Sequence, residues 1–381
     1  MVEPGIATIT GSFSGLEDPR DDSGKRHLLI DILVIAICAV ICGADNWVDV
    51  ENFGVAKYEW LKQFLELPHG IPSHDTFSRV FGLLDSEQFR SCFLRWIRAV
   101  ASLTPGQVIA IDGKRLRRSH DRTLGKAAIC MVSAWAEANR LVLGQTKTDG
   151  ASNEITAIPE LLQVLEFTGC IVTVDAIGCQ KTIAQTIIEQ GGDYVLALKE
   201  NQGGLYEAVE ELFAYAHEIE FRDVSHDSHK TVDKGHGRIE IRHCWTIADP
   251  EFLQYLPDWQ GWPQLDTLVM VQAERRDGDQ VTHKTRYYIT SLDNNARRAL
   301  YAVRGHWSIE NGLHWVLDIA FREDESRIRK DNGPQNFAIL RHIALNLLKQ
   351  ETTAKCGIKA KRLKAAWSEP YLGKVLDGLA A

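Results

Sequence analysis

The sequence predicts an α/β protein in which a mixed sheet with flanking helices is preceded by an all-helical unit and interrupted by a β-rich insertion. Helical patterns fill residues 16–105. Short apolar strands then alternate with helical segments through residues 106–219. Strand-like segments separated by turns fill residues 220–293, and helical patterns return in residues 294–350. A chain of 381 residues is long enough for two or three domains with a sizeable core.

The N-terminal unit is predicted from its helix signals. Residues 1–15 carry no clear pattern and are expected to be loose. Helices are expected over residues 28–43, 47–67 and 87–103, and Ser73 is a good N-cap for a further helix. The apolar 28–43 segment is short for a membrane span and is expected to be a buried helix. Helices joined by short turns can form a DNA-binding module of the helix-turn-helix type, but a structural cap fits the same pattern.

Two apolar strands lead into aspartates. Residues 108–111 run into Asp112, and residues 170–174 run into Asp175. Gly113 is expected to turn the chain directly after the first aspartate. A carboxylate at a strand end can hold a hard cation such as Mg²⁺. A capping aspartate beside a solvated loop is the simpler alternative.

The remaining elements follow from the alternation of patterns. Residues 126–136 and 140–146 are expected to form a hairpin that extends the first strand into an antiparallel meander. Other core elements are expected to be helices over 155–166, 181–190 and 203–217 and a strand over 193–199. The insertion is expected to contain strands over 238–247, 267–275 and 285–291. Helices are expected again over 296–321 and 333–350.

Charge is distributed unevenly along the chain. The net charge of −8 argues weakly against a nucleic-acid partner, but binding depends on where the positive charge lies. Six Lys/Arg and two Asp between residues 111 and 126 give that segment a local charge of +4. Candidates for contact with phosphate there are Lys114, Arg115, Arg117 and Arg118. A second basic run, residues 355–364, lies in a segment 351–381 that is expected to be a basic C-terminal tail.

The cysteines and the N-terminus bear on the cellular setting. None of the eight cysteines forms a CxxC pair, which argues against a zinc knuckle, and several lie in apolar runs as buried free thiols do. The first fifteen residues lack the basic and apolar regions of a signal peptide. A reduced, cytoplasmic setting without a membrane partner is therefore expected.

A third carboxylate is needed to build a two-metal site with the two aspartates. The best candidate is Glu310, because His306, Glu310, His314 and Asp318 are spaced by four and share one helical face. Two cations about 3.5–4 Å apart can clamp the attacking and leaving oxygens of a phosphoryl displacement. The alternative is a polar stripe that faces solvent.

These residues carry a family resemblance. The chain resembles bacterial insertion-sequence transposases of the DDE, RNase H-like class, and more narrowly the H-repeat-associated transposases, over nearly its whole length. The motifs that carry the resemblance are Asp18-Pro-Arg20 with Arg26-His27, Gly43-Ala-Asp-Asn-Trp47, Gly70-Ile-Pro-Ser-His-Asp-Thr-Phe77, Ile111-Asp-Gly-Lys114, Val174-Asp-Ala176, Leu198-Lys-Glu-Asn201, and Gly305-His-Trp-Ser-Ile-Glu-Asn311 with Leu313-His-Trp-Val-Leu-Asp318.

The resemblance implies a fold, an activity and partners. It implies an RNase H-like mixed sheet, with an associated N-terminal domain over residues 16–105 and a β-rich insertion before the last acid. The implied metal-binding and catalytic triad is Asp112, Asp175 and Glu310, with two Mg²⁺ or Mn²⁺ ions. The implied partner is double-stranded DNA, at both the element's ends and the target, bound by a homo-oligomer. A strand would be cut at the element's end, and its 3′-hydroxyl would attack the target.

The chain departs from one signature of related transposases, a Tyr-Arg-Glu-Lys set around the last acid. In that register this chain has Val303, His306 and Leu317 at the tyrosine, arginine and lysine positions. Phosphate contacts by Arg304, His306 and Arg322 are expected from their place in the sequence and have no support from that signature.

Two rival functions remain at this stage. A nuclease on the same scaffold would cut DNA without joining it, and a relic of a transposase would bind DNA without catalysis. The presence of all three acids argues against a decayed copy.

Overall fold

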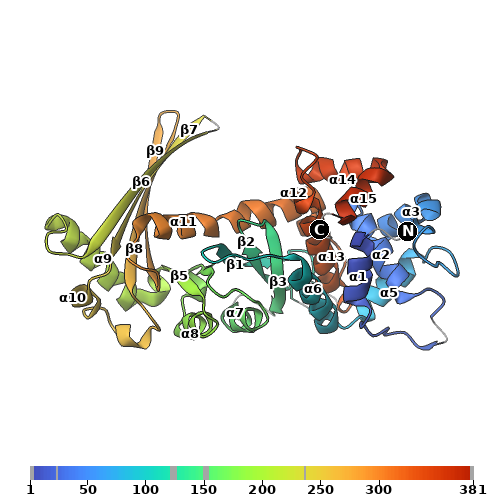
Figure 1. Cartoon of the computed structure of the whole chain (residues 1–381), viewed down its shortest axis with the longest axis horizontal. Helices are drawn as coiled ribbons and strands as arrows, with labels where there is room; N and C mark the ends of the chain where they lie inside the picture. Colours follow the sequence, from blue (N-terminus) through green and yellow to red (C-terminus); the bar gives the residue numbers. More distant parts are fainter. Residues whose placement is uncertain (1–3, 23–24, 121–126, 149–153, 236, 378–381) are drawn as a thin grey trace.

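The computed structural model describes residues 4–22, 25–120, 127–148, 154–235 and 237–377. The molecule is elongated, with a helical unit at one end and a twisted sheet at the other (Figure 1). No helix in these ranges is long and apolar enough to cross a membrane.

Within the described residues, one nine-stranded sheet carries both the core and the insertion. Its strands are β1 (Val108–Arg115), β2 (Cys130–Ala136), β3 (Leu141–Thr148), β4 (Ile171–Val174), β5 (Asp193–Leu198), β6 (His226–Gly235), β7 (Arg238–Ile247), β8 (Thr267–Asp277) and β9 (Gln280–Thr290). Their order is β3-β2-β1-β4-β5-β9-β8-β7-β6. Because β1 is parallel to β4 and antiparallel to β2, the sheet is mixed, which confirms the predicted RNase H-like α/β class.

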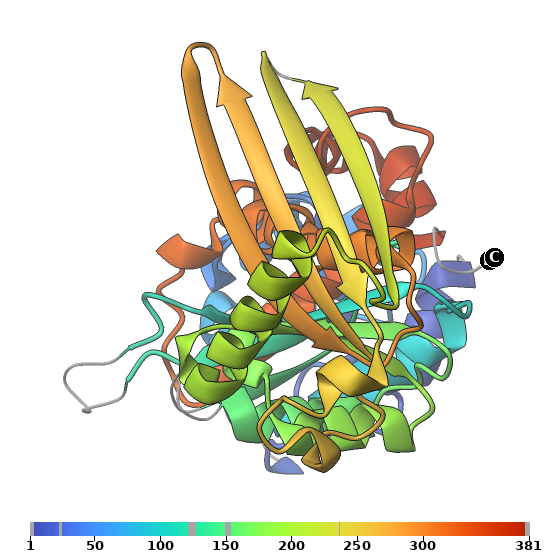
Figure 2. The same ribbon diagram turned by 90° about the vertical axis from the view of Figure 1, so that its left-hand side faces the viewer.

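The insertion continues the core sheet. β9 pairs antiparallel with β5, and the long strands β6 to β9 then project beyond the body of the molecule (Figure 2). β6 was not expected from the sequence, because nearly all of its residues are polar; in the structure only four of its ten residues are partly buried.

Two local predictions about the first strands were wrong. β1 does not end at Asp112, and Gly113 makes no turn, because antiparallel pairing with β2 continues as far as Arg115. The hairpin forms as expected, but its first strand begins at Cys130; Lys126, the expected start, lies outside the described residues.

Helices cover both faces of the core strands. The helices that follow the core strands are α7 (Glu154–Gln163), α8 (Lys181–Glu189) and α9 (Gly203–Glu218), and the short α10 (Pro250–Leu253) lies within the insertion. Figure 1 shows α7 and α8 on one face, and α11 (Ala296–His306) on the other, where it packs on β1 and β4. The helix expected over residues 296–321 is interrupted: a π-helical turn, Glu310–His314, separates α11 from α12 (Trp315–Phe321).

The helical unit is built from both ends of the chain. Its helices are α1 (Pro4–Phe13), α2 (Leu29–Ile41), α3 (Trp47–Ala56), α4 (Tyr58–Leu61), α5 (His74–Leu83), α6 (Ser86–Val100), α13 (Gly333–Gln350), α14 (Ile358–Trp367) and α15 (Glu369–Asp377). The α13 helix is buried along nearly its whole length and packs on α2, α5 and α6. Its Asn346 also exchanges hydrogen bonds with the backbone of Val142 in β3, at 2.8 and 3.0 Å. The helical unit and the sheet therefore share one core.

Both chain ends are more ordered than expected. Residues 4–13 form α1 rather than a loose segment, because Ile9 and Phe13 are buried in the core. The expected basic tail instead contains α14 and α15, since two of its cations face inward. Lys361 donates to the carbonyl of Leu348 at 2.9 Å, and Arg362 donates to carbonyls of the α2 end and to Asp45.

Replacing Arg362 should destabilise the whole fold. Its guanidinium donates to the carbonyls of Val40, Ala44 and Ala320, so Arg362→Ala leaves buried acceptors without partners. We expect a loss of about 3–5 kcal/mol in the free energy of unfolding, measured by urea denaturation. The exposed Lys359→Ala should stay within about 0.5 kcal/mol of wild type. Equal effects of the two variants would contradict the assigned role of Arg362.

Candidate active site

Strand pairing brings the two aspartates together. In the parallel β1–β4 pair Ile111 lies opposite Val174, so Asp112 and Asp175 are the next residues on adjacent strands. Asp175 ends its strand by accepting a hydrogen bond from the backbone N–H of Ile177, 3.1 Å away. That bond fixes the carboxylate at the carboxyl end of β4, beside Asp112.

Glu310 lines the same cavity as the two aspartates, but it comes from the helical segment that follows α11. It begins the π-helical turn, a local widening that often occurs at functional sites. The π-helical turn packs directly on β2: a Cβ added to Gly312 would lie 2.8 Å from the ring of Trp135. The indole N–H of Trp135 also donates to Ser308 Oγ at 3.1 Å. These contacts set the height of Glu310 above the sheet.

The three acids line one cavity of about 210 Å³. Its charged and ionisable lining residues are Asp112, Asp175, Lys199, Arg286, Tyr288, His306 and Glu310. The structure thus brings the three predicted acids together and adds two cations that had no predicted role, Arg286 and Lys199, the latter from the Leu198–Asn201 motif. Asn201 donates to the carbonyl of Ala176 at 2.7 Å and ties the loop after β5 to the loop that holds Asp175.

The site concentrates negative charge. Burial raises the pKa of Asp112 to about 7, and the nearby carboxylates of Asp175, Glu154 and Glu310 add to that rise. His314 Nδ1 lies 3.5 Å from Asp112 Oδ2. Burial lowers the pKa of His314 to about 4, so the imidazole is neutral near pH 7 and does not offset the charge of Asp112.

Glu154 is a fourth carboxylate that sequence reasoning missed. It opens α7, and its carboxylate lies against the β1 backbone: a Cβ on Gly113 would come within 2.5 Å of Glu154 Oε1. The thiol of Cys130 donates to the same oxygen at 3.3 Å. Gly113 therefore provides space for a carboxylate rather than a turn. The available signal was an acid in the first turn of a predicted helix, which is common for other reasons.

The donor atoms suit a hard divalent cation, but they are not gathered around one point. Carboxylate oxygens are the ligands that Mg²⁺ and Mn²⁺ prefer. In the described part of the chain, however, no three His, Cys, Asp or Glu side chains are placed to hold a metal ion. Asp112 and Asp175 instead accept backbone hydrogen bonds from Gly113 and Ile177. Ligation of one ion by all three acids would need a rotation of their side chains.

Lys114 is engaged within the protein. Its ammonium lies 2.6 Å from Asp318, 2.8 Å from Glu323 and 3.5 Å from Asp324, and only 11% of its side chain is exposed. The expected contact between Lys114 and phosphate is therefore not supported by its surroundings. Of its neighbours in the predicted cluster, Arg117 pairs with Asp324 at 3.0 Å.

The other predicted phosphate-contacting residues occupy different places. Arg115 and Arg118 are exposed on the segment that follows Asp112. His306 is largely enclosed, with Nδ1 3.1 Å from the hydroxyl of Thr173. Arg322 pairs with Glu325 at the surface and is not among the residues that line the cavity.

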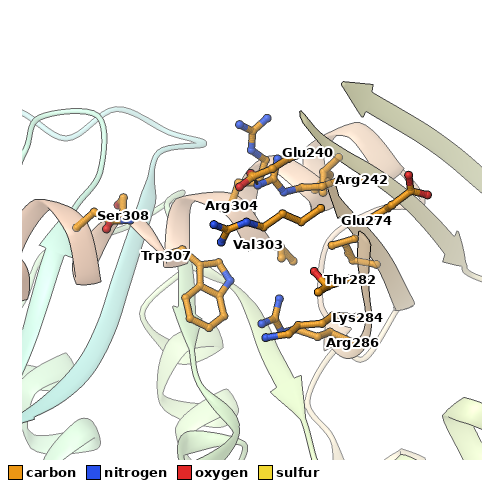
Figure 3. A pocket seen from close by; sticks show the side chains of 15 residues that line it. Glu240, Arg242, Glu274, Thr282, Lys284, Arg286, Val303, Arg304, Trp307 and Ser308 are labelled. Atoms are coloured by element: carbon orange, nitrogen blue, oxygen red, sulfur yellow. Dashed lines mark hydrogen bonds and ion pairs between the residues drawn. The ribbon is translucent and has the colours of Figure 1, made fainter. Parts of the chain in front are cut away.

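A groove of about 550 Å³ adjoins the cavity between α11 and strands β7 to β9 (Figure 3). The two share Arg286, Val303 and Trp307. The basic residues along the groove are Arg242, Arg275, Lys284, Arg286 and Arg304, against the two acids Glu240 and Glu274. The guanidinium of Arg286 lies 4.8 Å from the ring centre of Trp307. The groove is a basic channel with an aromatic side chain that leads into the acidic cavity.

Comparison with known families decides the class of protein. Residues 103–347 match the family described as "Transposase DDE domain", and residues 10–97 match the family described as "DDE_Tnp_1-associated". The chain belongs to the DDE transposase family.

Similar transposases match it almost end to end. The chain is 43% identical to the "H repeat-associated putative transposase YhhI" of Escherichia coli K12 over 96% of this chain and 97% of that protein. It is 41% identical to the "Putative transposase YncI" of Escherichia coli O157:H7 over 97% and 95%. Among solved structures, the piggyBac transposase synaptic complex with hairpin DNA covers 97% of this chain and 79% of that chain, at 11% identity and a TM-score of 0.42.

The raised pKa of Asp112 predicts a pH-dependent stability in this transposase. Since the folded state holds this proton more tightly than the unfolded state, the free energy of unfolding should fall as pH rises from about 4 to 7. In chelator at about pH 8, Asp112→Asn should raise it by about 1–3 kcal/mol, allowing for solvent screening. The gain should vanish near pH 4. The exposed Asp223→Asn is the control, and a pH profile shared by both variants would contradict the prediction.

Proposed function

We propose that this transposase catalyses metal-dependent cleavage of DNA strands and their transfer to a target. The observation that supports the proposal most directly is the convergence of Asp112, Asp175 and Glu310 on one cavity. These acids come from β1, the end of β4 and the π-helical turn, all within the stretch that matches the DDE domain. A basic groove that opens into the cavity fits a polyanionic substrate.

The charged residues of the cavity divide into two groups in the proposal. Asp112, Asp175 and Glu310 would hold two Mg²⁺ or Mn²⁺ ions. When bound, these ions lower the pKa of water or a 3′-hydroxyl and stabilise charge on the phosphate oxygens. Lys199 and Arg286, which line the same cavity, would attract and orient the phosphate. A bound cation would favour the ionised form of Asp112 and so would lower its raised pKa.

Glu154 extends the acidic set in this proposal. Its carboxylate approaches the β1 backbone directly after Asp112, from the face that α7 covers. From there its carboxylate would serve as a further oxygen ligand or hydrogen-bond acceptor for the cation site beside Asp112. Either role uses the space that Gly113 leaves open.

The basic groove receives the DNA strand next to the scissile phosphate. Its arginines offer forked donors that suit phosphate oxygens. The Trp307 ring, 38% exposed, can stack on a base. Arg304 lies in this groove and pairs with Asp233 at 3.1 Å, so DNA would compete with that carboxylate for the guanidinium. The proposal also places the protein in the cytoplasm, as a homo-oligomer on DNA that joins element ends to a target.

The three acids should act as one unit. Asp112→Asn, Asp175→Asn or Glu310→Gln should each reduce Mg²⁺-dependent nicking by at least about 1000-fold, because incomplete ligation loses the metal's charge stabilisation. DNA affinity should change less than about threefold. A labelled oligonucleotide carrying the element's end separates joining from cutting alone: nicking without strand joining would assign a nuclease. If the wild-type protein binds DNA but does not nick it, the remaining candidate is a non-catalytic, DNA-binding relic of a transposase.

Gly113→Ala tests the place of Glu154. The new Cβ must push the Glu154 carboxylate aside, and since only the end of a flexible side chain has to move, stability should change by less than about 1 kcal/mol. Mn²⁺ affinity, measured by calorimetry, should fall by about tenfold in both Gly113→Ala and Glu154→Gln. Combining the two should cost no more than either alone. Wild-type Mn²⁺ affinity in Glu154→Gln would show that Glu154 only caps α7.

A further inference from the structure

A strip of six cations runs from the active-site strand to the helical unit. The strip comprises Arg115, Arg117 and Arg118 after β1, and Arg327, Arg329 and Lys330 in the loop before α13. All except the partly buried Arg329 are exposed. The second group was not part of the sequence prediction, because its segment, Ser326 to Gly333, reads as an ordinary polar turn.

Backbone contacts join the two halves of the strip. Arg329 Nε donates to the carbonyl of Arg118 at 3.0 Å, so the two basic segments lie side by side. The loop is also fixed to α5: Asn332 N donates to the carbonyl of Gly82 at 3.1 Å, and its side chain donates to the carbonyl of Leu84 at 3.1 Å. The cations of the loop are therefore held on a preformed surface.

The strip makes few ion pairs, although the charge of Arg118 also acts on the exposed Glu325. Arg117 pairs with Asp324, but within the described ranges no ion pair involves Arg115, Arg118, Arg327 or Lys330. Exposed cations left without partners in a protein of net charge −8 are a local excess that a polyanion can neutralise.

The loop end of the strip forms one wall of a hollow of about 590 Å³. The opposite wall is the start of α3 and α5, including His74 in the Gly70–Phe77 motif that otherwise has no assigned role. Two acids, Asp75 and Asp331, also line the hollow, so its charge is less positive than that of the open strip.

From these observations we propose that the strip binds the phosphate backbone of duplex DNA and directs it from the active site to the hollow beside α5. The inference rests on the proposed function, since the strip starts three residues beyond Asp112. Arginine forks match phosphate oxygens, and cations spaced along a surface match the regular spacing of phosphates. The helical unit then contacts DNA through this loop and the α5 start rather than through an inserted recognition helix.

The test uses the full-length chain, because α13 completes the core of the helical unit. The double variant Arg327→Gln/Lys330→Gln removes two exposed cations of the loop. Arg140→Gln/Arg222→Gln is the matched control: Arg140 lies at the β2–β3 turn, the opposite end of the strands from Arg115, and Arg222 follows α9. The probe is a labelled random duplex of about 40 base pairs, titrated from about 50 to 200 mM KCl.

A plot of log affinity against log salt should be less steep for the strip variant, by about 1.8, since each lost contact on a duplex accounts for about 0.9. Between the two salt concentrations the wild type should then lose about 12-fold more affinity than the variant. The control should keep the wild-type slope. Arg327→Lys/Lys330→Arg should keep it as well, which separates loss of charge from a folding defect.

Three outcomes decide between the possibilities. A strip variant with the control's slope, in a protein that binds and nicks DNA, overturns this inference and leaves the proposed function intact. A wild-type protein that neither binds nor nicks DNA overturns both. A reduced slope together with Mg²⁺-dependent nicking that persists at saturating protein supports the strip as a binding surface outside the chemistry.

Discussion

The buried ion-pair network around Lys114 holds the active site together. Lys114 lies on β1, two residues beyond Asp112, and its ammonium contacts Asp318 of α12 and Glu323 just beyond it. Glu323 is 2% exposed and also faces Arg341 of α13, 3.6 Å away. Burial alone would raise the pKa of Glu323, but Lys114 and Arg341 lower it, so the carboxylate stays ionised. Removing one member of such a network leaves a buried charge unpaired, which costs about 3–5 kcal/mol.

The network and the strand pairing together connect the three segments that carry the acids. β4 is fixed to β1 by strand pairing, so Asp175 follows Asp112. The segment with Glu310 has no backbone pairing to the sheet, since it is helical. Its position depends on side chains, namely the Lys114 network at its end and the Trp135 contacts at its start. Lys114 therefore ties β1 to the helical segment that follows Glu310, although its charge and sequence position suggested phosphate binding.

The sequence predicted those features of the fold that depend on the residue pattern within a single segment. Apolar runs located the two strands that lead into Asp112 and Asp175, whereas their parallel pairing, which brings the two aspartates together, is seen only in the structure. The pattern could not show that Gly113 faces Glu154, because the contact joins residues 41 positions apart and depends on how α7 packs. It also could not show that Lys361 and Arg362 face inward, since a buried cation and a solvated one look alike in sequence. The strand β6 was missed because it is polar on both faces at the edge of the sheet.

Continuity of the insertion with the core sheet has a consequence for function. β5 and β9 are hydrogen-bonded neighbours, so the wall of the basic groove is anchored through β5 to β4, the strand that ends at Asp175. A rigid sheet transmits position along its strands, whereas a separately hinged domain would let the groove move relative to the acids. Arg286 illustrates the coupling: it lies on β9 and lines both the groove and the acidic cavity. In the proposed function, a DNA strand in the groove would therefore reach the carboxylates along a wall that belongs to the same sheet, while the π-helical turn supplies Glu310, which the Trp135 and Lys114 contacts hold in place.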